Sequence, residues 1–232
     1  MATARTPLPS RRASRASIRR AREREILAAT RLLFDERGMQ DAPIEDIARE
    51  VGINKALIYR HFSSKEELFV LTLTSYLSDL ASRLEEVSST LDPAAQLEEG
   101  WRRYTDFCLE HPAFLDCGLS LMRGPAGELR ETISDAVWIR LGQGMAACLG
   151  KLSRILALGV EQGVFAIEDP DFTANHLYTQ TLGTMHLARI GVGVRAGPGG
   201  VPEPFPIKAR QVQEACIADV LASVGARPAR TA

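Results

Sequence analysis

The chain has 232 residues, of which 45% are apolar and 25% are charged, as is usual for a globular protein of one or two domains. The net charge is −1, but residues 1–24 carry eight arginines and one glutamate, a net +7, so the remainder carries −8. The four cysteines are far apart, no apolar run reaches the roughly 20 residues of a membrane helix, and the basic start lacks the apolar segment of a secretory signal. Zinc, a disulfide framework, a membrane span and secretion are therefore not expected, and we expect a cytoplasmic protein.

The first part of the chain predicts a basic arm followed by a helix. Residues 1–20 are rich in Arg, Ser, Ala and Pro and poor in large apolar residues, which predicts disorder in the free protein. This arm could be an inert solvated tail, or it could add phosphate or minor-groove contacts to a neighbouring DNA-binding motif. Residues 21–38 show an apolar stripe at helical spacing that ends at Gly38, which predicts the first helix.

Two short helices are predicted next. Apolar residues at helical spacing favour a helix over about residues 43–51, and Gly52 stands where a left-handed residue would end it. Asn54 is a good N-cap for a second helix over residues 55–61. Ser63 and Ser64 each precede a glutamate by three residues, the spacing of a capping box, so a longer helix is expected to start there.

The second short helix has the chemistry of a DNA-reading element. Two short helices joined by a tight turn with glycine form a helix-turn-helix motif, whose second helix can lie in the major groove. The stretch 53–65 contains three Lys or Arg residues and one His and no acid. Leu57 is turned about 100° from Ile58, so a buried Ile58 places Leu57 near the surface, where it suits contact with a thymine methyl. A plain helical hairpin with a solvated basic face is the competing interpretation.

The stretch IEDIAREVGINKALIYRHFSSKEELF resembles the DNA-binding signature of the TetR family of transcription regulators, over about residues 24–76. The resemblance implies that the second short helix reads the major groove. It implies phosphate contacts for Tyr59, His61 and Lys65 and base or backbone contacts for Lys55, Ala56 and Leu57. The complete predicted DNA-binding set is Lys55, Ala56, Leu57, Tyr59, Arg60, His61 and Lys65.

The sequence departs from the family pattern at two places. The family usually has Thr or Ser where Ala42 and Pro43 stand, capping the first short helix and binding a phosphate. Pro43 suits a first helical position, but Ala42 offers no side-chain cap. The position of Leu57 is more often small or polar, so the operator sequence cannot be inferred from relatives.

The rest of the chain is predicted to be helical. The helix that opens at Ser63 or Ser64 is expected to run to about Thr90, before Pro93. Further helices are predicted over about residues 93–110, to about 122, and over 128–162, 170–190 and 207–224. No alternating run predicts a sheet, and the Gly- and Pro-rich stretch 191–206 is predicted as a loop. The predicted fold class is all-α, with the basic arm (1–20), a three-helix DNA-binding domain (21–68), a larger helical domain (69–225) and a loose tail (226–232).

The larger domain is expected to serve dimerisation and effector binding. The resemblance implies a homodimer formed by the last two long helices, where Gly183, Thr184 and Ala188 are small enough for close approach. It also implies a small-molecule effector held between the middle helices, with binding shifting the dimer away from the geometry that fits a palindromic operator. Candidate lining residues are Trp101, Tyr104, Cys108, Met122, Trp138, Met145, Tyr178 and Met185. Ordinary core packing is the competing explanation for each of them.

The function predicted from these features is a dimeric DNA-binding transcriptional regulator, most simply a repressor released by its effector. A helical enzyme is the main alternative, but no Gly-x-Ser-x-Gly, phosphate loop or HExxH motif is present in the sequence. A protein-binding adaptor is a third reading, against which the basic, acid-free second helix argues. No cofactor is implied, and His176 and His186 lack carboxylate neighbours at metal-binding spacing.

Overall fold

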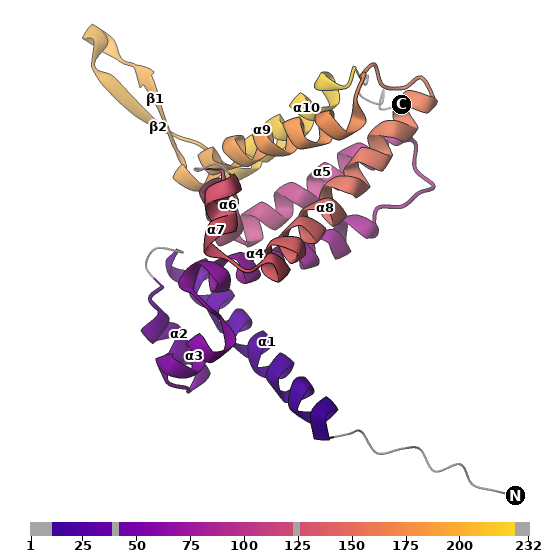
Figure 1. The fold of residues 1–232 in the computed structure, drawn as a ribbon. Coiled ribbons are helices and arrows are strands. Elements are labelled where there is room, and N and C mark those ends of the chain that lie inside the picture. The colour runs from indigo at the N-terminus through magenta and orange to yellow at the C-terminus, as the bar shows by residue number, and fades with distance from the viewer. Residues whose placement is uncertain (1–10, 39–41, 123–125, 226–232) are drawn as a thin grey trace, which may run out of the picture.

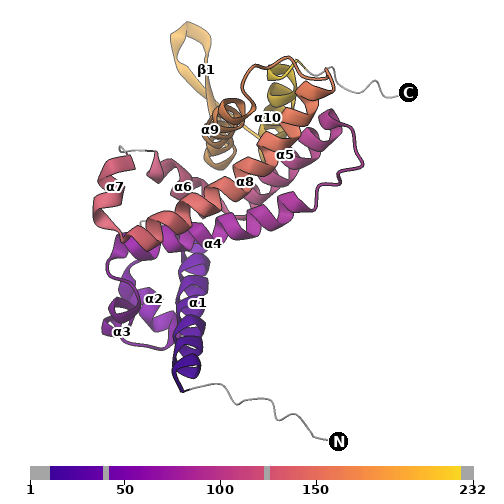
Figure 2. The same ribbon diagram turned by 45° about the vertical axis from the view of Figure 1, so that its right-hand side comes forward.

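The computed structural model describes residues 11–38, 42–122 and 126–225, which form a small helical head and a larger helical body (Figures 1 and 2). The head contains α1, α2, α3 and the start of α4, and the body contains the rest of α4 and all later elements. The helices are α1 (Arg11–Arg37), α2 (Ile44–Val51), α3 (Lys55–His61), α4 (Lys65–Glu85), α5 (Pro93–Glu110), α6 (Pro112–Leu121), α7 (Ala126–Thr132), α8 (Asp135–Glu161), α9 (Pro170–Ile190) and α10 (Ala209–Ser223). A β-hairpin, β1 (Val192–Ala196) and β2 (Pro202–Pro206), joins α9 to α10 around a short 3-10 turn, η1 (Pro198–Gly200).

The head folds as its local signals predict. Gly52 has φ of +71° and closes α2, since only glycine adopts this left-handed conformation readily. The Asn54 side chain accepts a hydrogen bond from the Leu57 backbone N–H at 2.9 Å, which caps α3. Ile58 is fully buried, as expected, in a core that also contains Ile26 and Phe62. Pro43 occupies the N-cap position of α2 rather than its first turn, and this cap has no side-chain hydrogen bond.

The body is a stack of long helices around an aromatic core. Trp101 and Tyr104 on α5 and Phe114 on α6 are almost completely buried. The Trp101 indole N–H donates to Thr181 Oγ1 at 2.9 Å, which joins α5 to α9. None of the helices in the described ranges is long and apolar enough to cross a membrane. The same ranges contain no group of three or more His, Cys, Asp or Glu side chains that could hold a metal ion.

Two predicted helix ends were wrong. Helix α1 begins at Arg11, so residues 11–20, predicted to be disordered, are helical, while residues 1–10 and the tail 226–232 lie outside the described residues. Arginine and alanine are good helix formers, and this preference outweighs the low hydrophobicity of the segment. Helix α4 ends at Glu85 rather than near Thr90. Beyond it, Ser88 and Thr90 bond to one another through their side chains, the local bonding that competes with a continued helix.

The predicted helix over 128–162 is two helices in the structure. Ser134, at φ −68° and ψ 152°, is extended and separates α7 from α8, while Ile133 turns inward and is buried. The apolar period continues across this break, so periodicity alone does not reveal it.

The predicted loop 191–206 was also wrong, because residues 192–196 and 202–206 pair as antiparallel strands with Val194 opposite Pro204. Proline and glycine are depleted in strands, so composition argued against a hairpin here.

Candidate nucleic-acid interface

Helix α3 presents one open face and one anchored face. Ile58 is buried beneath the helix, whereas Lys55, Ala56 and Tyr59 are exposed, Tyr59 to 43%. Leu57 is half-buried beside them. The exposed face therefore combines a cation, a phenol and apolar side chains on a helix short enough to enter a groove.

Lys55 is held by an acid of the neighbouring helix. Its Nζ lies 2.5 Å from Glu45 Oε1 on α2. The hydrogen bond from Lys55 lowers the pKa of Glu45, and the same bond raises the pKa of Lys55. Both side chains are more than half exposed, so this pair contributes little stability. Lys55 can therefore exchange Glu45 for a phosphate at small cost.

The two basic residues at the end of α3 differ in their exposure to solvent. Arg60 is exposed, but the His61 side chain is only 11% exposed and its Nδ1 lies 3.8 Å from Glu23 on α1. Within the described ranges, His61 Nδ1 has no hydrogen-bond partner. This placement favours a role for His61 in packing α3 against α1 more than direct contact with DNA.

Lys65 is the first residue of α4, the helix that follows α3 in the chain. Ser64 caps α4 by accepting a hydrogen bond from the Glu67 backbone N–H at 3.0 Å, and Lys65 is exposed in the first turn. The N-terminus of a helix favours anions, and an adjacent lysine strengthens that preference. The arrangement suits contact with the phosphates that flank a groove occupied by α3.

Helix α1 carries exposed arginines in its N-terminal half. In Figures 1 and 2 the N-terminal half of α1 continues beyond α2 and α3, away from the body. Arg19, Arg20 and Arg24 on this half are exposed, although Arg19 pairs with Glu23 at 3.1 Å. Arg20 and Arg24 line a pocket together with Arg140 of α8, so they lie on the side of α1 that faces the body.

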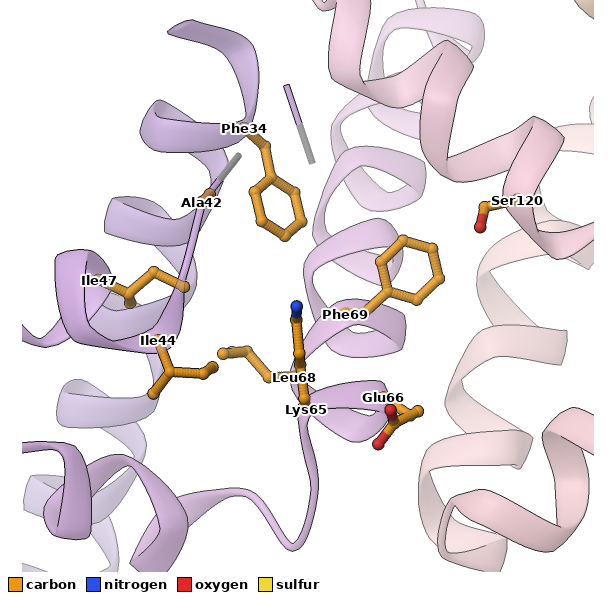
Figure 3. Close-up of a pocket in the computed structure, with 9 residues that line it drawn as sticks. All are labelled: Phe34, Ala42, Ile44, Ile47, Lys65, Glu66, Leu68, Phe69 and Ser120. Carbon is orange, nitrogen blue, oxygen red and sulfur yellow. The ribbon is translucent and has the colours of Figure 1, made fainter. Parts of the chain in front are cut away.

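A pocket separates the head from α6 of the body (Figure 3). It has a volume of about 220 Å³ and is lined mainly by apolar side chains, with Phe34, Ile44 and Leu68 on one side and Phe69 and Ser120 on the other. The head is therefore incompletely packed against the body here, and α4 is the element that runs continuously through both.

The predicted effector residues are only partly brought together. Tyr104, Met145 and Tyr178 line a cavity of about 10 Å³ between α4, α5, α8 and α9, too small for more than one water. Sequence analysis missed the aliphatic and Cys residues that also line it, Leu77, Leu80, Leu84, Cys148, Leu149 and Leu152. Trp101 and Cys108 adjoin Tyr104 without lining the cavity, and Met122, Trp138 and Met185 lie elsewhere, Met122 being 43% exposed.

One polar group in this cluster has no partner. The Tyr104 hydroxyl is buried and makes no hydrogen bond to any described residue, although the thiol of Cys108, a weak hydrogen-bonding group, lies near it. Burial raises the pKa of Tyr104 well above its ordinary value, so it is a neutral donor. Burial also raises the pKa of the Cys148 thiol to about 12, which keeps that cysteine unreactive.

Comparisons with known proteins agree with this geometry. Residues 26–71 match the family model described as bacterial regulatory proteins, tetR family. The transcriptional repressor KstR2 of Rhodococcus jostii is 39% identical over 94 residues, covering 40% of this chain and 45% of the relative. The transcriptional activator FasR of Mycolicibacterium smegmatis is 32% identical over 91 residues, covering 39% of this chain and 41% of the relative. The alignments span less than half the length of these curated relatives.

Solved structures extend the similarity to the whole fold. KstR2 of Mycobacterium tuberculosis, a ketosteroid transcriptional regulator, has a TM-score of 0.58 at 23% identity, covering 88% of this chain and 94% of the other. RolR in complex with resorcinol has a TM-score of 0.64 at 20% identity, covering 92% of each chain. These similarities establish the fold, a helix-turn-helix head on a helical body, and the matched family consists of regulators rather than enzymes.

Proposed function

We propose that this chain, which belongs through residues 26–71 to the tetR family of bacterial regulatory proteins, is a dimeric DNA-binding regulator of transcription in the cytoplasm. The observation that carries the proposal is α3, a two-turn helix whose Lys55, Ala56 and Tyr59 are exposed over a buried Ile58. In this proposal the protein is a repressor, and a small molecule releases it from a palindromic operator. The proposed division is a reading head over 21–68 and an effector and dimer domain over 69–225.

Exposed faces of α9 and α10 support the dimer. Along α9 a stripe at helical spacing stays open to solvent, and along α10 three alanines do the same; these residues are Phe172, His176, Thr179, Gly183, Leu187, Ile190, Ala215, Ala218 and Ala222. Of the three small residues predicted for the interface, Gly183 is exposed and Thr184 and Ala188 are half-buried. Two chains packed through this surface present two reading helices, which fit half-sites about 34 Å apart on one face of a duplex.

A salt series tests DNA binding. The ligand is a duplex selected from a random pool by the wild-type protein, and the logarithm of its affinity should fall steeply and linearly with the logarithm of salt concentration. Lys65→Ala should reduce the slope by about 2 in the dimer, since each lysine that holds a phosphate contributes about 0.9. Arg154→Ala, at an exposed cation on α8, is the control and should leave the slope unchanged. A flat salt dependence in the wild type would exclude the proposed function.

The effector proposal rests on the Tyr104 cluster. We propose a mostly apolar ring compound with one oxygen that accepts a hydrogen bond from Tyr104, as both resorcinol and a ketosteroid could. The cavity is nearly closed, because Gly144 on α8 lies so near Leu77 on α4 that an added Cβ would be 3.2 Å from it. A ligand must therefore separate α8 from α4, which favours a second state of the dimer.

Removing the unpartnered hydroxyl should stabilise the free protein. Tyr104→Phe eliminates a buried donor that has only the weakly accepting Cys108 sulfur near it, and it should raise the free energy of unfolding by about 1 kcal/mol. Tyr76→Phe is the matched control, since the Tyr76 hydroxyl donates to the Arg31 carbonyl at 3.3 Å and its loss should not stabilise. Urea unfolding measures both. A thermal-shift panel of phenols and ketosteroids should give a shift for the wild type that Tyr104→Phe reduces.

A further inference from the structure

The β1–β2 hairpin projects from the body beyond the ends of α9 and α10 (Figures 1 and 2). Its two strands pair in antiparallel register from Val192 opposite Pro206 to Ala196 opposite Pro202. Isolated two-stranded hairpins are only marginally stable in water, and a stable one usually packs a face against another element. The chemistry of the two hairpin faces therefore indicates which of them packs against another element.

The two faces of the hairpin differ in chemistry. Alternation along the strands places six residues without charge on one face, all of them exposed, namely Val192, Val194, Ala196, Pro202, Pro204 and Pro206. The side chains of the other face contact one another. Arg195 forms an ion pair with Glu203 at 2.8 Å and lies 5.9 Å from the centre of the Phe205 ring. Phe205 in turn covers Gly193, where an added Cβ would be 2.5 Å from the ring. Among the described residues, the apolar face is thus the one left without a partner.

The free edge of β2 is closed to further strand pairing. Hydrogen bonds from Gly197 N to Val201 O and from Ile207 N to Gly191 O, both 2.9 Å, flank the ladder and set its alternation. The three prolines consequently fall in the pairs that do not exchange hydrogen bonds, with their nitrogens toward the outer edge. Proline has no N–H to offer an added strand, so pairing along this edge is blocked. Any contact of β2 with another protein surface is therefore expected through its apolar face rather than through this edge.

We propose that this apolar face packs against a second copy of the chain, at the N-terminal end of the partner's α9. The inference rests on the proposed dimer and adds a contact of the hairpin at one end of its helical interface. The hairpin continues that interface directly, because α9 leads into β1 and β2 leads into α10. Ile190 and Val192, on either side of the junction, are 57% and 46% exposed, so the apolar stripe of α9 runs on into the strand.

Two-fold symmetry identifies the meeting point. Two heads that bind one duplex need a two-fold axis running from body to head, and α9 lies across that direction (Figure 1). The two α9 helices then cross antiparallel, so the C-terminal end of each, which bears the hairpin, lies near the N-terminal end of the other. That end carries Phe172, which is 67% exposed in its own chain. A Val and Pro face is the chemistry that would cover such a ring.

The test is the dimer dissociation constant of the full chain, measured by sedimentation over a concentration series. Val194→Asp, at a side chain 70% exposed on the apolar face, should raise this constant at least about tenfold. Val201→Asp is the matched control, since Val201 is 65% exposed but belongs to the opposite face, and it should change the constant less than about twofold. Equal effects of the two substitutions, or none, would overturn the proposal.

A double-mutant cycle tests the specific contact. Val194→Ala and Phe172→Ala should each weaken the dimer, and together they should weaken it less than the product of the single effects. Strictly multiplicative effects would remove Phe172 of the partner subunit as the contact. If the dimer binds the selected duplex and its dissociation constant is unchanged by all hairpin substitutions, only this inference is refuted. If the chain is a monomer that binds no duplex, the proposed function is refuted.

Discussion

Replacing Ala56 by Glu should strongly weaken binding to the selected duplex while leaving the fold intact. Ala56 is exposed in the first turn of α3, so a carboxylate there would face the phosphates of the groove in both protomers. At a few ångströms, like charges near a protein surface repel by roughly 1–4 kcal/mol, and two such repulsions reduce affinity at least about 25-fold. An acid in the first turn favours the helix dipole, so the free energy of unfolding should not fall.

The charge can be separated from the size of the new side chain. Ala56→Gln has nearly the same volume as Ala56→Glu and no charge, so it should cost much less affinity. Fluorescence anisotropy with the labelled duplex measures both variants, and thermal unfolding checks their stability. Equal losses for Gln and Glu would indicate a steric effect, and wild-type affinity in both would place α3 outside the groove.

The head was predictable from sequence because its signals are local. Gly52 and Asn54 act within one or two residues of themselves, and each has the conformation or hydrogen bond that its side chain predicts. Ser64 caps α4 in one of the two registers that the sequence offered. The exposure of Ala56 and Tyr59 then follows from the helical period once Ile58 is buried.

Features that depend on tertiary placement were not predictable in this way. His61 turns toward Glu23 because α1 passes beside α3, and a resemblance to a family motif carries no information on that packing. The apolar cluster around Tyr104 draws residues from four helices, so residue type alone selected some members, such as Met145, and also Met122, which is exposed. The hairpin was missed because strand propensity penalises proline everywhere, whereas proline is tolerated at an outward-facing edge position.

Glu67 joins the reading head to the body and is the residue whose loss should affect both. It is buried in the first turn of α4, and its carboxylate accepts hydrogen bonds from the Ser63 backbone N–H at 2.6 Å and from the Ser63 hydroxyl. Its other oxygen accepts from Ser134 Oγ at 3.1 Å, at the residue that precedes α8. The Glu67 carboxylate therefore joins Ser63, at the end of the helix-turn-helix segment, to Ser134, at the start of α8, a helix that lines the Tyr104 cavity.

Glu67→Ala should lower the free energy of unfolding by about 2–4 kcal/mol, since hydrogen bonds to a charged group are worth about 1.5–3 kcal/mol each. Burial would raise the pKa of Glu67, but the hydrogen bonds from Ser63 and Ser134 outweigh it and the pKa is lowered. A carboxyl with a lowered folded pKa stabilises the fold fully above its unfolded value of about 4.5 and loses that contribution as the pH falls through the folded value. The difference between wild type and variant in urea unfolding should therefore shrink below that pH.

Glu66→Ala is the matched control, because Glu66 is the adjacent acid of the same turn but is exposed. It should change stability by less than about 0.5 kcal/mol at any pH. If α4 and α8 transmit effector binding through Glu67, a compound that weakens DNA binding of the wild type should weaken that of the Glu67→Ala variant less, and that of the Glu66→Ala variant equally. A Glu67→Ala protein with unchanged stability and an unchanged effector response would show that the shared carboxylate does not couple the head to the body.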